Sequence, residues 1–272
     1  MESLEVERME SLNEKNSLLV EDIGSGVLVL TINSPRTLNA LDGQILQDLK
    51  GAFGVCAKDP KVRVVLLTGK GKAFVAGADI SALSDFTPEQ AAGFSRNGCE
   101  LFDLMEKIPQ PIVAVINGFA LGGGLELALA CDFRFAAEGA KLGLPEILLG
   151  IIPGFGGTQR LVSVAGASRA REMIFTGRRL DAAEALACGL VDRVLPAERL
   201  LDESKAFAME LATRSQSALA QAKWVLNSTR NLSLQEGLML ENQAFSRCFE
   251  HKDSREGIRA FLEKRKPEFG KP

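Results

Sequence analysis

One stretch decides how this chain folds: Asn117-Gly-Phe-Ala-Leu-Gly-Gly-Gly-Leu-Glu-Leu-Ala-Leu-Ala-Cys-Asp132. It follows an apolar run at residues 112–116 that predicts a strand, and its own apolar second half predicts a short helix. The three glycines at 122–124 allow a sharp turn and the close approach of another molecule to the backbone. A helix that begins there presents free N–H groups to negative charge that develops beside it.

Glu126 interrupts the apolar residues of this expected helix. Burying an ionised carboxyl group is costly, so we expect the pKa of Glu126 to be raised. A carboxyl group with a tuned pKa beside oxyanion donors suits proton transfer next to a carbonyl group. A simpler interpretation fits the stretch equally well: the glycines permit close helix packing, and the glutamate interacts favourably with the helix dipole.

Strand and helix patterns alternate on both sides of this stretch. Residues 17–21 and 27–32 predict a β-hairpin, and the run at 62–68, apolar throughout 64–67, predicts a strand buried on both faces. Further strands are expected at 132–136 and 191–195, and helices at 42–58, 87–107, 158–164, 168–175 and 181–188. Such alternation predicts an α/β fold with parallel strand pairing.

Beyond about residue 200 only helical patterns remain, at 201–213, 218–227, 234–249 and 254–264. We therefore divide the chain into a polar tail at 1–16, a core that carries the active site at 17–210 and a helical region at 211–272. The last region has more apolar residues than a short helix pair needs. Core packing and subunit contact explain this surplus equally well.

Composition excludes several classes of protein. The 272 residues are 46% hydrophobic with a net charge of −3, which gives no electrostatic reason to expect nucleic acid as a partner. His251 is the only histidine, which removes most metal sites and Ser-His-Asp triads. The five cysteines are widely spaced, and no apolar run reaches membrane-spanning length, so we expect reduced thiols in a cytoplasmic protein.

Two further glycine-bearing loops lie next to apolar elements. The loop Lys72-Ala-Phe-Val-Ala-Gly-Ala-Asp-Ile80 follows an expected strand, where α/β sheets bind ligands, and Asp79 there is expected to cap the next turn. The loop Pro153-Gly-Phe-Gly-Gly-Thr-Gln-Arg160 precedes a helix. Neither fits a phosphate loop or a dinucleotide fingerprint. Glu146 follows Pro145 among apolar residues, so it is a second carboxyl group whose pKa can be shifted to serve as acid or base.

Taken together, these motifs resemble the crotonase, or enoyl-CoA hydratase/isomerase, superfamily, and most closely its bacterial-type enoyl-CoA hydratases. The resemblance runs from about residue 17 to residue 266. It is carried by Ser34-Pro-Arg-Thr-Leu-Asn-Ala-Leu41, Lys72-Ala-Phe-Val-Ala-Gly-Ala-Asp-Ile80, Asn117-Gly-Phe-Ala-Leu-Gly-Gly-Gly-Leu-Glu126, Leu144-Pro-Glu-Ile-Leu-Leu-Gly150, Ile152-Pro-Gly-Phe-Gly-Gly-Thr-Gln-Arg-Leu161 and Phe261-Leu-Glu-Lys-Arg-Lys266.

The resemblance implies a spiral of ββα units with a C-terminal helical region that packs trimers, usually paired into hexamers. It implies hydration of a trans-2-enoyl-CoA to a 3-hydroxyacyl-CoA, with no metal and no cofactor besides the coenzyme A of the substrate. The catalytic pair falls on Glu126 and Glu146. The two N–H groups of the oxyanion hole fall on Ala78 and Gly123, and the glycine that seats the water is Gly154.

The resemblance also implies which residues bind the substrate. Many hydratases of the family have lysine where this chain has Ser81, so other residues would have to hold the CoA nucleotide. The implied substrate-binding residues are Arg36, Leu38, Ala76, Gly77, Asp79 and Ile80, together with Phe261 and Lys264 from a neighbouring subunit.

Two alternatives remain at the level of sequence. A different crotonase reaction, such as double-bond isomerisation, keeps the oxyanion hole, but such enzymes often change one of the two acids that this chain retains. An RNA-binding member of the fold would need a basic helix face. The helix expected at 42–58 carries only Lys50 and Lys58 as cations, so RNA binding is the weaker alternative.

Overall fold

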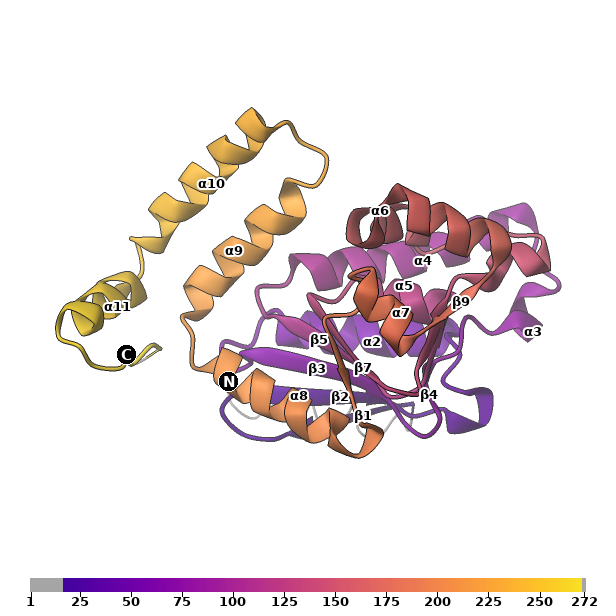
Figure 1. The fold of residues 1–272 in the computed structure, drawn as a ribbon, viewed down its shortest axis with the longest axis horizontal. Coiled ribbons are helices and arrows are strands. Elements are labelled where there is room, and N and C mark those ends of the chain that lie inside the picture. The colour runs from indigo at the N-terminus through magenta and orange to yellow at the C-terminus, as the bar shows by residue number, and fades with distance from the viewer. Residues whose placement is uncertain (1–16, 271–272) are drawn as a thin grey trace.

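The larger of two sheets has the strand order β1-β2-β3-β5-β7-β10 (Figure 1). The computed structural model describes residues 17–270, so the tail expected at 1–16 lies outside the described residues. The strands are β1 (Leu18–Asp22), β2 (Val27–Ile32), β3 (Val64–Gly69), β5 (Ile112–Ile116), β7 (Phe133–Ala137) and β10 (Arg193–Leu195). The hairpin of β1 and β2 is antiparallel, and every later pairing in this sheet is parallel, as the sequence predicts.

A second sheet of short strands, in the order β4-β6-β8-β9, was not predicted. Its strands are β4 (Ala73–Val75), β6 (Phe119–Leu121), β8 (Lys141–Gly143) and β9 (Arg179–Asp181). The chain enters the larger sheet, crosses to the smaller one and then forms a helix or turn, as in β5, β6 and the helix that follows. This repeating path is the expected spiral of ββα units.

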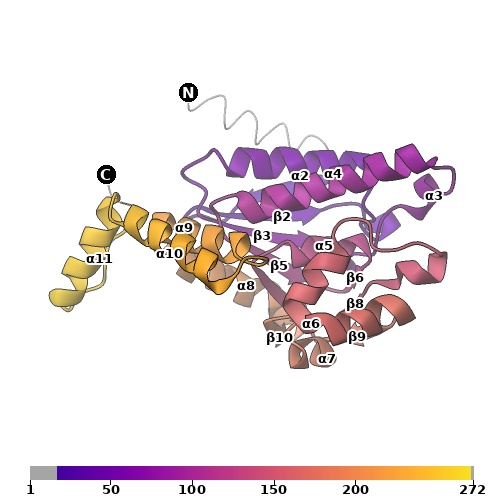
Figure 2. The same ribbon diagram turned by 90° about the horizontal axis from the view of Figure 1, so that it is seen from above.

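Helices cover both faces of the larger sheet (Figures 1 and 2). Helices α2 (Gly43–Cys56) and α4 (Pro88–Lys107) pack on one face, and α8 (Ala197–Ala212) lies on the other. Alternating residues of β3 face these two layers. Val65 and Leu67 belong to the apolar cluster that includes α2 and α4, while Val64 and Leu66 belong to the cluster that includes α8. This arrangement explains the continuous apolar run, because a strand covered on both faces has no polar side.

The remaining helices of the core are shorter or kinked. They are α3 (Ile80–Leu83), α5 (Gly123–Leu129), α6 (Gly157–Thr176) and α7 (Ala182–Ala187), with 3₁₀ turns η1 (Pro35–Thr37) and η2 (Pro145–Leu149). The two helices expected at 158–164 and 168–175 are confirmed: α6 consists of two helical segments that meet at a kink, where Gly166 has a non-helical backbone with φ +78° and ψ 160°. Capping boxes at Thr87 and Asp181 start α4 and α7, which begin close to the residues expected for them.

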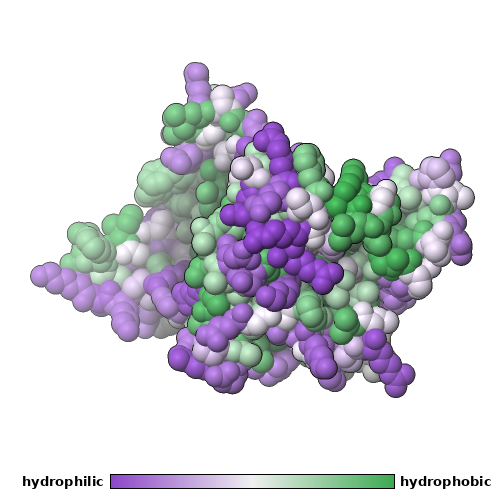
Figure 3. Space-filling view, turned by 45° about the vertical axis from the view of Figure 1, so that its right-hand side comes forward, coloured by the Kyte–Doolittle hydropathy of each residue, from purple (hydrophilic) through white to green (hydrophobic). Residues whose placement is uncertain are grey.

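Three C-terminal helices project to one side of the sheets (Figures 1 and 2). They are α9 (Gln216–Ser228), α10 (Leu234–Cys248) and α11 (Lys252–Leu262), close to the expected ranges. Apolar patches appear at the far left of Figure 3, where these helices lie. The exposed apolar side chains of α10 and α11 are Leu234, Leu238, Met239, Phe245, Ile258, Phe261 and Leu262.

Candidate active site

A pocket of about 730 Å³ lies among the segments that follow the strands of the two sheets. It is enclosed by the segment after β4, the start of α5, the turn η2, the loop before α6 and one side of α4. The residues that the sequence predicted for the site and that line this pocket are Ala76, Gly77, Ala78, Ile80, Gly123, Glu126, Glu146 and Gly154. Segments far apart in the sequence therefore meet here.

The segment after β4 is held in place by the loop before α2. Asn39 is fully buried, and its amide donates to the carbonyls of Lys70, Ala73 and Phe74 at 2.8–3.2 Å. Leu41 then forms an isolated parallel bridge with Ala78.

In that bridge, Leu41 donates its N–H to the Gly77 carbonyl at 2.8 Å and accepts from Asp79 N–H at 3.0 Å. The N–H of Ala78, between them, is left without a hydrogen-bond partner among residues 17–270.

The glycine turn before α5 is consistent with both roles considered from the sequence, close helix packing and an N–H donor for a ligand. Gly122 has φ +50° and ψ −126°, which side-chain-bearing residues rarely adopt. A Cβ atom on Gly124 would lie 2.0 Å from the Val75 carbonyl oxygen, so close packing requires this glycine. Gly123 is the first residue of α5 and lines the pocket, and its N–H has no acceptor within the helix. The glycines thus serve packing and also leave a donor in the pocket.

Glu126 is 1% exposed, and its Oε1 accepts hydrogen bonds from Phe155 N–H at 2.8 Å and Gly157 N–H at 2.7 Å. Burial raises its pKa to about 6, while these two hydrogen bonds and the charge of Arg160 oppose the rise. Gly157 is the first residue of α6, so the carboxylate also lies at the positive end of that helix. The predicted rise in pKa is confirmed, and it is moderate because the site stabilises the anion.

Glu146 is half-buried on η2 and approaches the glycine turn. A Cβ atom on Gly122 would lie 3.0 Å from Glu146 Oε1, and Oε2 is buried with no hydrogen-bond partner among the described residues. Burial raises the pKa of Glu146 to about 7, its own backbone N–H opposes this, and the charge of Glu126 adds to the rise. The two carboxyl groups therefore titrate as an interacting pair.

Five of the predicted substrate-binding residues do not line the pocket. Asp79 caps α3 by accepting from the backbone N–H and hydroxyl of Ser81, which confirms the capping role expected for it. Leu38 has φ +53° and accepts from Ala76 N–H, so it shapes the loop. The others are exposed side chains of η1 and the C-terminal end: Arg36, Phe261 and Lys264.

The sequence did not predict how the loop before α6 serves the site. Ser95 on α4 donates its hydroxyl to the Gly154 carbonyl at 2.5 Å, and Arg160 Nη1 donates to the Phe155 carbonyl at 2.8 Å. The sequence shows a glycine-rich pattern at 153–157. It gave no signal that the N–H groups of this loop bind Glu126.

Comparison with known proteins identifies the family. The family model described as enoyl-CoA hydratase/isomerase matches residues 22–272. The chain belongs to the enoyl-CoA hydratase/isomerase family. The resemblance stated from the motifs is thereby confirmed over nearly the whole chain.

Individual members of the enoyl-CoA hydratase/isomerase family are similar throughout their length. A crotonyl-CoA hydratase from Syntrophomonas wolfei is 43% identical over 89% of this chain and 93% of its own. A short-chain-enoyl-CoA hydratase from Clostridium acetobutylicum is 40% identical over 94% and 98%. The crystal structure of an enoyl-CoA hydratase from Bacillus anthracis superposes with a TM-score of 0.90 at 40% identity, covering 93% of this chain and 98% of that one.

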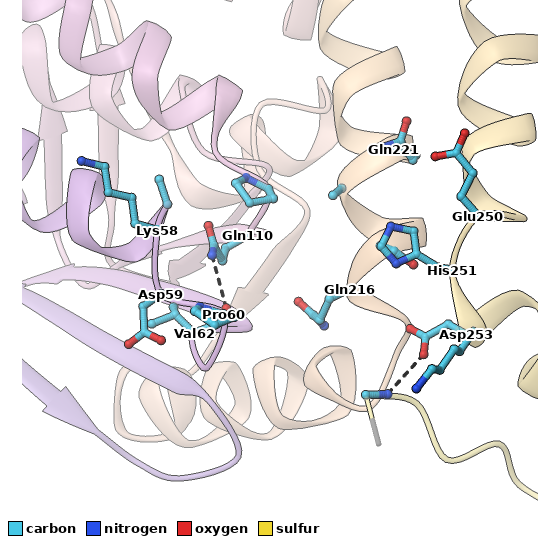
Figure 4. Close-up of a pocket in the computed structure, with 16 residues that line it drawn as sticks. Lys58, Asp59, Pro60, Val62, Gln110, Gln216, Gln221, Glu250, His251 and Asp253 are labelled. Carbon is cyan, nitrogen blue, oxygen red and sulfur yellow. Dashed lines mark hydrogen bonds between the residues drawn. The ribbon is translucent and has the colours of Figure 1, made fainter. Parts of the chain in front are cut away.

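A second cavity, of about 690 Å³, separates the core from the C-terminal helices (Figure 4). Gln110 lies on its core side and His251, which is exposed, on its helical side. No predicted site residue is among those that line this cavity.

Residues 17–270 contain neither a membrane-spanning helix nor a metal-binding cluster. No helix there is both long and apolar enough to cross a membrane, and no cluster of three metal-binding side chains is found. The five cysteines are free; Cys56 and Cys131 are buried and the other three half-buried.

Proposed function

We propose that this protein is an enoyl-CoA hydratase that adds water across the C2=C3 bond of a trans-2-enoyl-CoA to give a 3-hydroxyacyl-CoA. One observation carries the proposal: two carboxyl groups with raised pKa values, Glu126 and Glu146, line one pocket with the backbone of Ala78 and Gly123. Enzymes of this family that catalyse other reactions often lack one of the two acids.

The thioester carbonyl oxygen would accept from the N–H groups of Ala78 and Gly123. Negative charge develops on this oxygen as water attacks C3 and the C2=C3 electrons move toward the carbonyl. Donors already aimed at the oxygen stabilise that charge without reorganisation, and each can lower the barrier by about 3 kcal/mol. The free Ala78 N–H and the first N–H of α5 support this role.

Glu126 would orient the water and take its proton, with Gly154 helping to seat the water. The water oxygen then bonds to C3, and Glu146 delivers a proton to C2 as the enolate collapses. With pKa values of about 6 and about 7, the pair can hold one proton between them near neutral pH. One carboxyl group then serves as base while the other serves as acid.

The coenzyme A portion would extend from the pocket toward the loop before α2. Arg36 would pair with its phosphates, Leu38 and Asp79 would shape the entrance, and Phe261 and Lys264 of a neighbouring subunit would complete the site. We propose a homotrimer or a dimer of trimers in the cytoplasm, and no cofactor besides the coenzyme A of the substrate. The exposed apolar side chains of α10 and α11 support subunit contact.

The test follows the loss of enoyl-thioester absorbance with crotonyl-CoA and identifies the product. We expect 3-hydroxybutyryl-CoA, in keeping with the crotonyl-CoA and short-chain names of two relatives. A shifted double bond without added water would instead identify an isomerase. No hydration of crotonyl-CoA or of longer enoyl-CoA substrates would contradict the proposal.

A further inference from the structure

The loop at residues 153–157 gives Glu126 both of its hydrogen-bond donors. Phe155 N–H and Gly157 N–H converge on the same oxygen, Oε1, at 2.8 and 2.7 Å. The direction of the carboxyl group therefore depends on where this loop holds its two peptide units. Any group that fixes the loop also fixes Glu126.

The side chain of Arg160 holds the loop at residues 153–157 through a hydrogen bond to its backbone. Its guanidinium group is buried, and Nη1 donates to the Phe155 carbonyl at 2.8 Å. The same guanidinium group packs against Gly156, where a Cβ atom would lie only 2.3 Å from Nη1. Gly156 also has φ +97°, so the loop conformation and the position of Arg160 depend on each other.

Two carboxylates of α4 hold the guanidinium group in this orientation. Glu106 accepts from Nε and Nη2 of Arg160, both at 3.1 Å, and Asp103 accepts from Nη2 at 2.8 Å. This planar, two-point contact leaves Nη1 aimed at the Phe155 carbonyl.

Glu106 is itself hydrogen-bonded to residues at the end of α9. Arg230 Nη1 donates to its Oε1 at 2.5 Å, and the amide of Asn227 donates to its backbone carbonyl at 2.9 Å. Burial alone would raise the pKa of Glu106, but hydrogen bonds and charge from Arg160 and Arg230 lower it below its usual value, so the carboxylate stays ionised. A continuous set of contacts thus runs from the end of α9 through Glu106 and Arg160 to the loop.

We propose that Arg160 is a positioning residue for hydration: by holding the Phe155 carbonyl it aims two peptide N–H groups, and through them Glu126, at the reacting water. The inference rests on the proposed function and adds to it. Charge alone would not suffice, because the role needs one planar group to bind two carboxylates and a carbonyl at once.

The test compares Arg160→Lys with wild type on crotonyl-CoA. Lysine keeps the charge but cannot make all of these contacts, so we expect kcat to fall about 10- to 100-fold while KM changes little. Arg169→Met is the matched control: Arg169 lies on the same helix, pairs with Glu172 and does not line the pocket. We expect its kcat to equal that of wild type.

Two further readouts separate positioning from general stability. In Arg160→Lys the acid limb of the pH–rate profile should move to higher pH, because the hydrogen bonds that lower the pKa of Glu126 are weakened. Hydrogen exchange of the amides at 155 and 157 should accelerate, a result that needs no turnover. Glu106→Gln, which loosens the same guanidinium group, should move both readouts in the same direction.

The outcomes distinguish this inference from the proposed function. An active wild type with kcat, acid limb and amide exchange unchanged in folded Arg160→Lys would overturn the inference alone. An inactive wild type would overturn the proposed function, and amide exchange would then decide whether Arg160 holds the loop. If Arg160→Lys only lowers the melting temperature, its role is structural and the proposal is wrong.

Discussion

The two glutamates of the site differ in how strongly their surroundings stabilise the ionised carboxylate. Glu126 is almost completely buried, yet two peptide N–H groups and the start of α6 stabilise its ionised form. Glu146 is less buried, but within residues 17–270 its Oε2 has no hydrogen-bond partner, and its pKa rises further, to about 7. The environment therefore favours ionisation of Glu126 before Glu146, which matches base and acid roles at neutral pH.

This difference predicts a bell-shaped dependence of kcat/KM on pH. Below about pH 6 Glu126 takes up a proton and loses its capacity as base, and above about pH 7 Glu146 loses the proton it must deliver. The measured midpoints belong to the coupled pair. Crotonyl-CoA hydration measured between about pH 5 and pH 9 should show both limbs. A constant rate across that range would contradict the assignment of roles.

At the scale of residues, the sequence predicted more about side chains than about peptide groups. Glu126 could be singled out because it is an acid in an apolar helix, and Glu146 because it follows Pro145 among apolar residues. Every residue except proline carries the same N–H group, so nothing in the sequence indicates that the amides of Phe155 and Gly157 bind Glu126. Their direction depends on the loop conformation, which distant contacts from α4 determine.

Helix α4 positions the site through a glycine in its buried face. A Cβ atom on Gly98 would lie 2.3 Å from the Phe155 ring. That ring is buried and packs against Phe94 and Phe102 at centroid distances of 5.1 and 5.7 Å, so it has little room to move. The ring and the N–H that binds Glu126 belong to the same residue, so displacing one disturbs the other.

We therefore expect Gly98→Ala to lower stability by about 1–3 kcal/mol through overpacking, and to lower kcat as well. Gly93→Ala is the control on the same helix, because a Cβ atom there meets nothing within 4 Å. It should raise stability by up to about 1 kcal/mol through better helix propensity. Urea unfolding and hydration kinetics measure both effects. Equal stability and equal kcat in the two variants would show that the contact between Gly98 and Phe155 affects neither folding nor hydration.

At the scale of elements, the sequence predicted long helices and strands well and missed the shortest strands. Helices with a capping box and several turns of apolar spacing, such as α4 and α10, were predicted within a few residues. The strands of the smaller sheet have three residues each, too few for a period of two to show. They form by pairing with one another across long stretches of sequence, and that pairing leaves no local pattern.

A buried lysine joins the C-terminal helices to the core of the molecule. Lys223 on α9 donates to the Met105 and Gln110 carbonyls at 2.9 Å and to Asp132 Oδ2 at 2.8 Å. Asp132 also accepts from Ile112 N–H, the first residue of β5. The acid expected at a strand start thus links α9, α4 and the larger sheet.

Replacing Lys223 with methionine should lower the free energy of unfolding by about 3 kcal/mol, because it leaves Asp132 largely buried and without its cation. Lys50→Met is the control. Lys50 pairs with Glu100 on the surface, both side chains are about half exposed, and its loss should change stability far less than the loss of Lys223, because solvent screens the pair. Chemical unfolding at one protein concentration compares them. Equal effects would show that Lys223 does not stabilise the junction.

The apolar side chains on α10 and α11 predict that the protein is an oligomer. Phe261 is 82% exposed and Leu234 81% exposed, on helices that project from the sheets. Sedimentation equilibrium should give a mass three or six times that of one chain. Replacing Leu234 and Phe261 with aspartate should lower that mass. A monomer at micromolar concentration would contradict subunit contact through these helices.

The most direct test of hydration by two glutamates compares Glu126→Gln, Glu146→Gln and wild type on crotonyl-CoA. Glutamine has nearly the same shape, and its oxygen can still accept from Phe155 and Gly157 N–H at position 126. We predict that each variant folds normally and loses about 10²- to 10⁴-fold in kcat, because each has lost a proton-transfer group. If either folded variant keeps a rate close to that of wild type, the two-carboxyl mechanism is wrong.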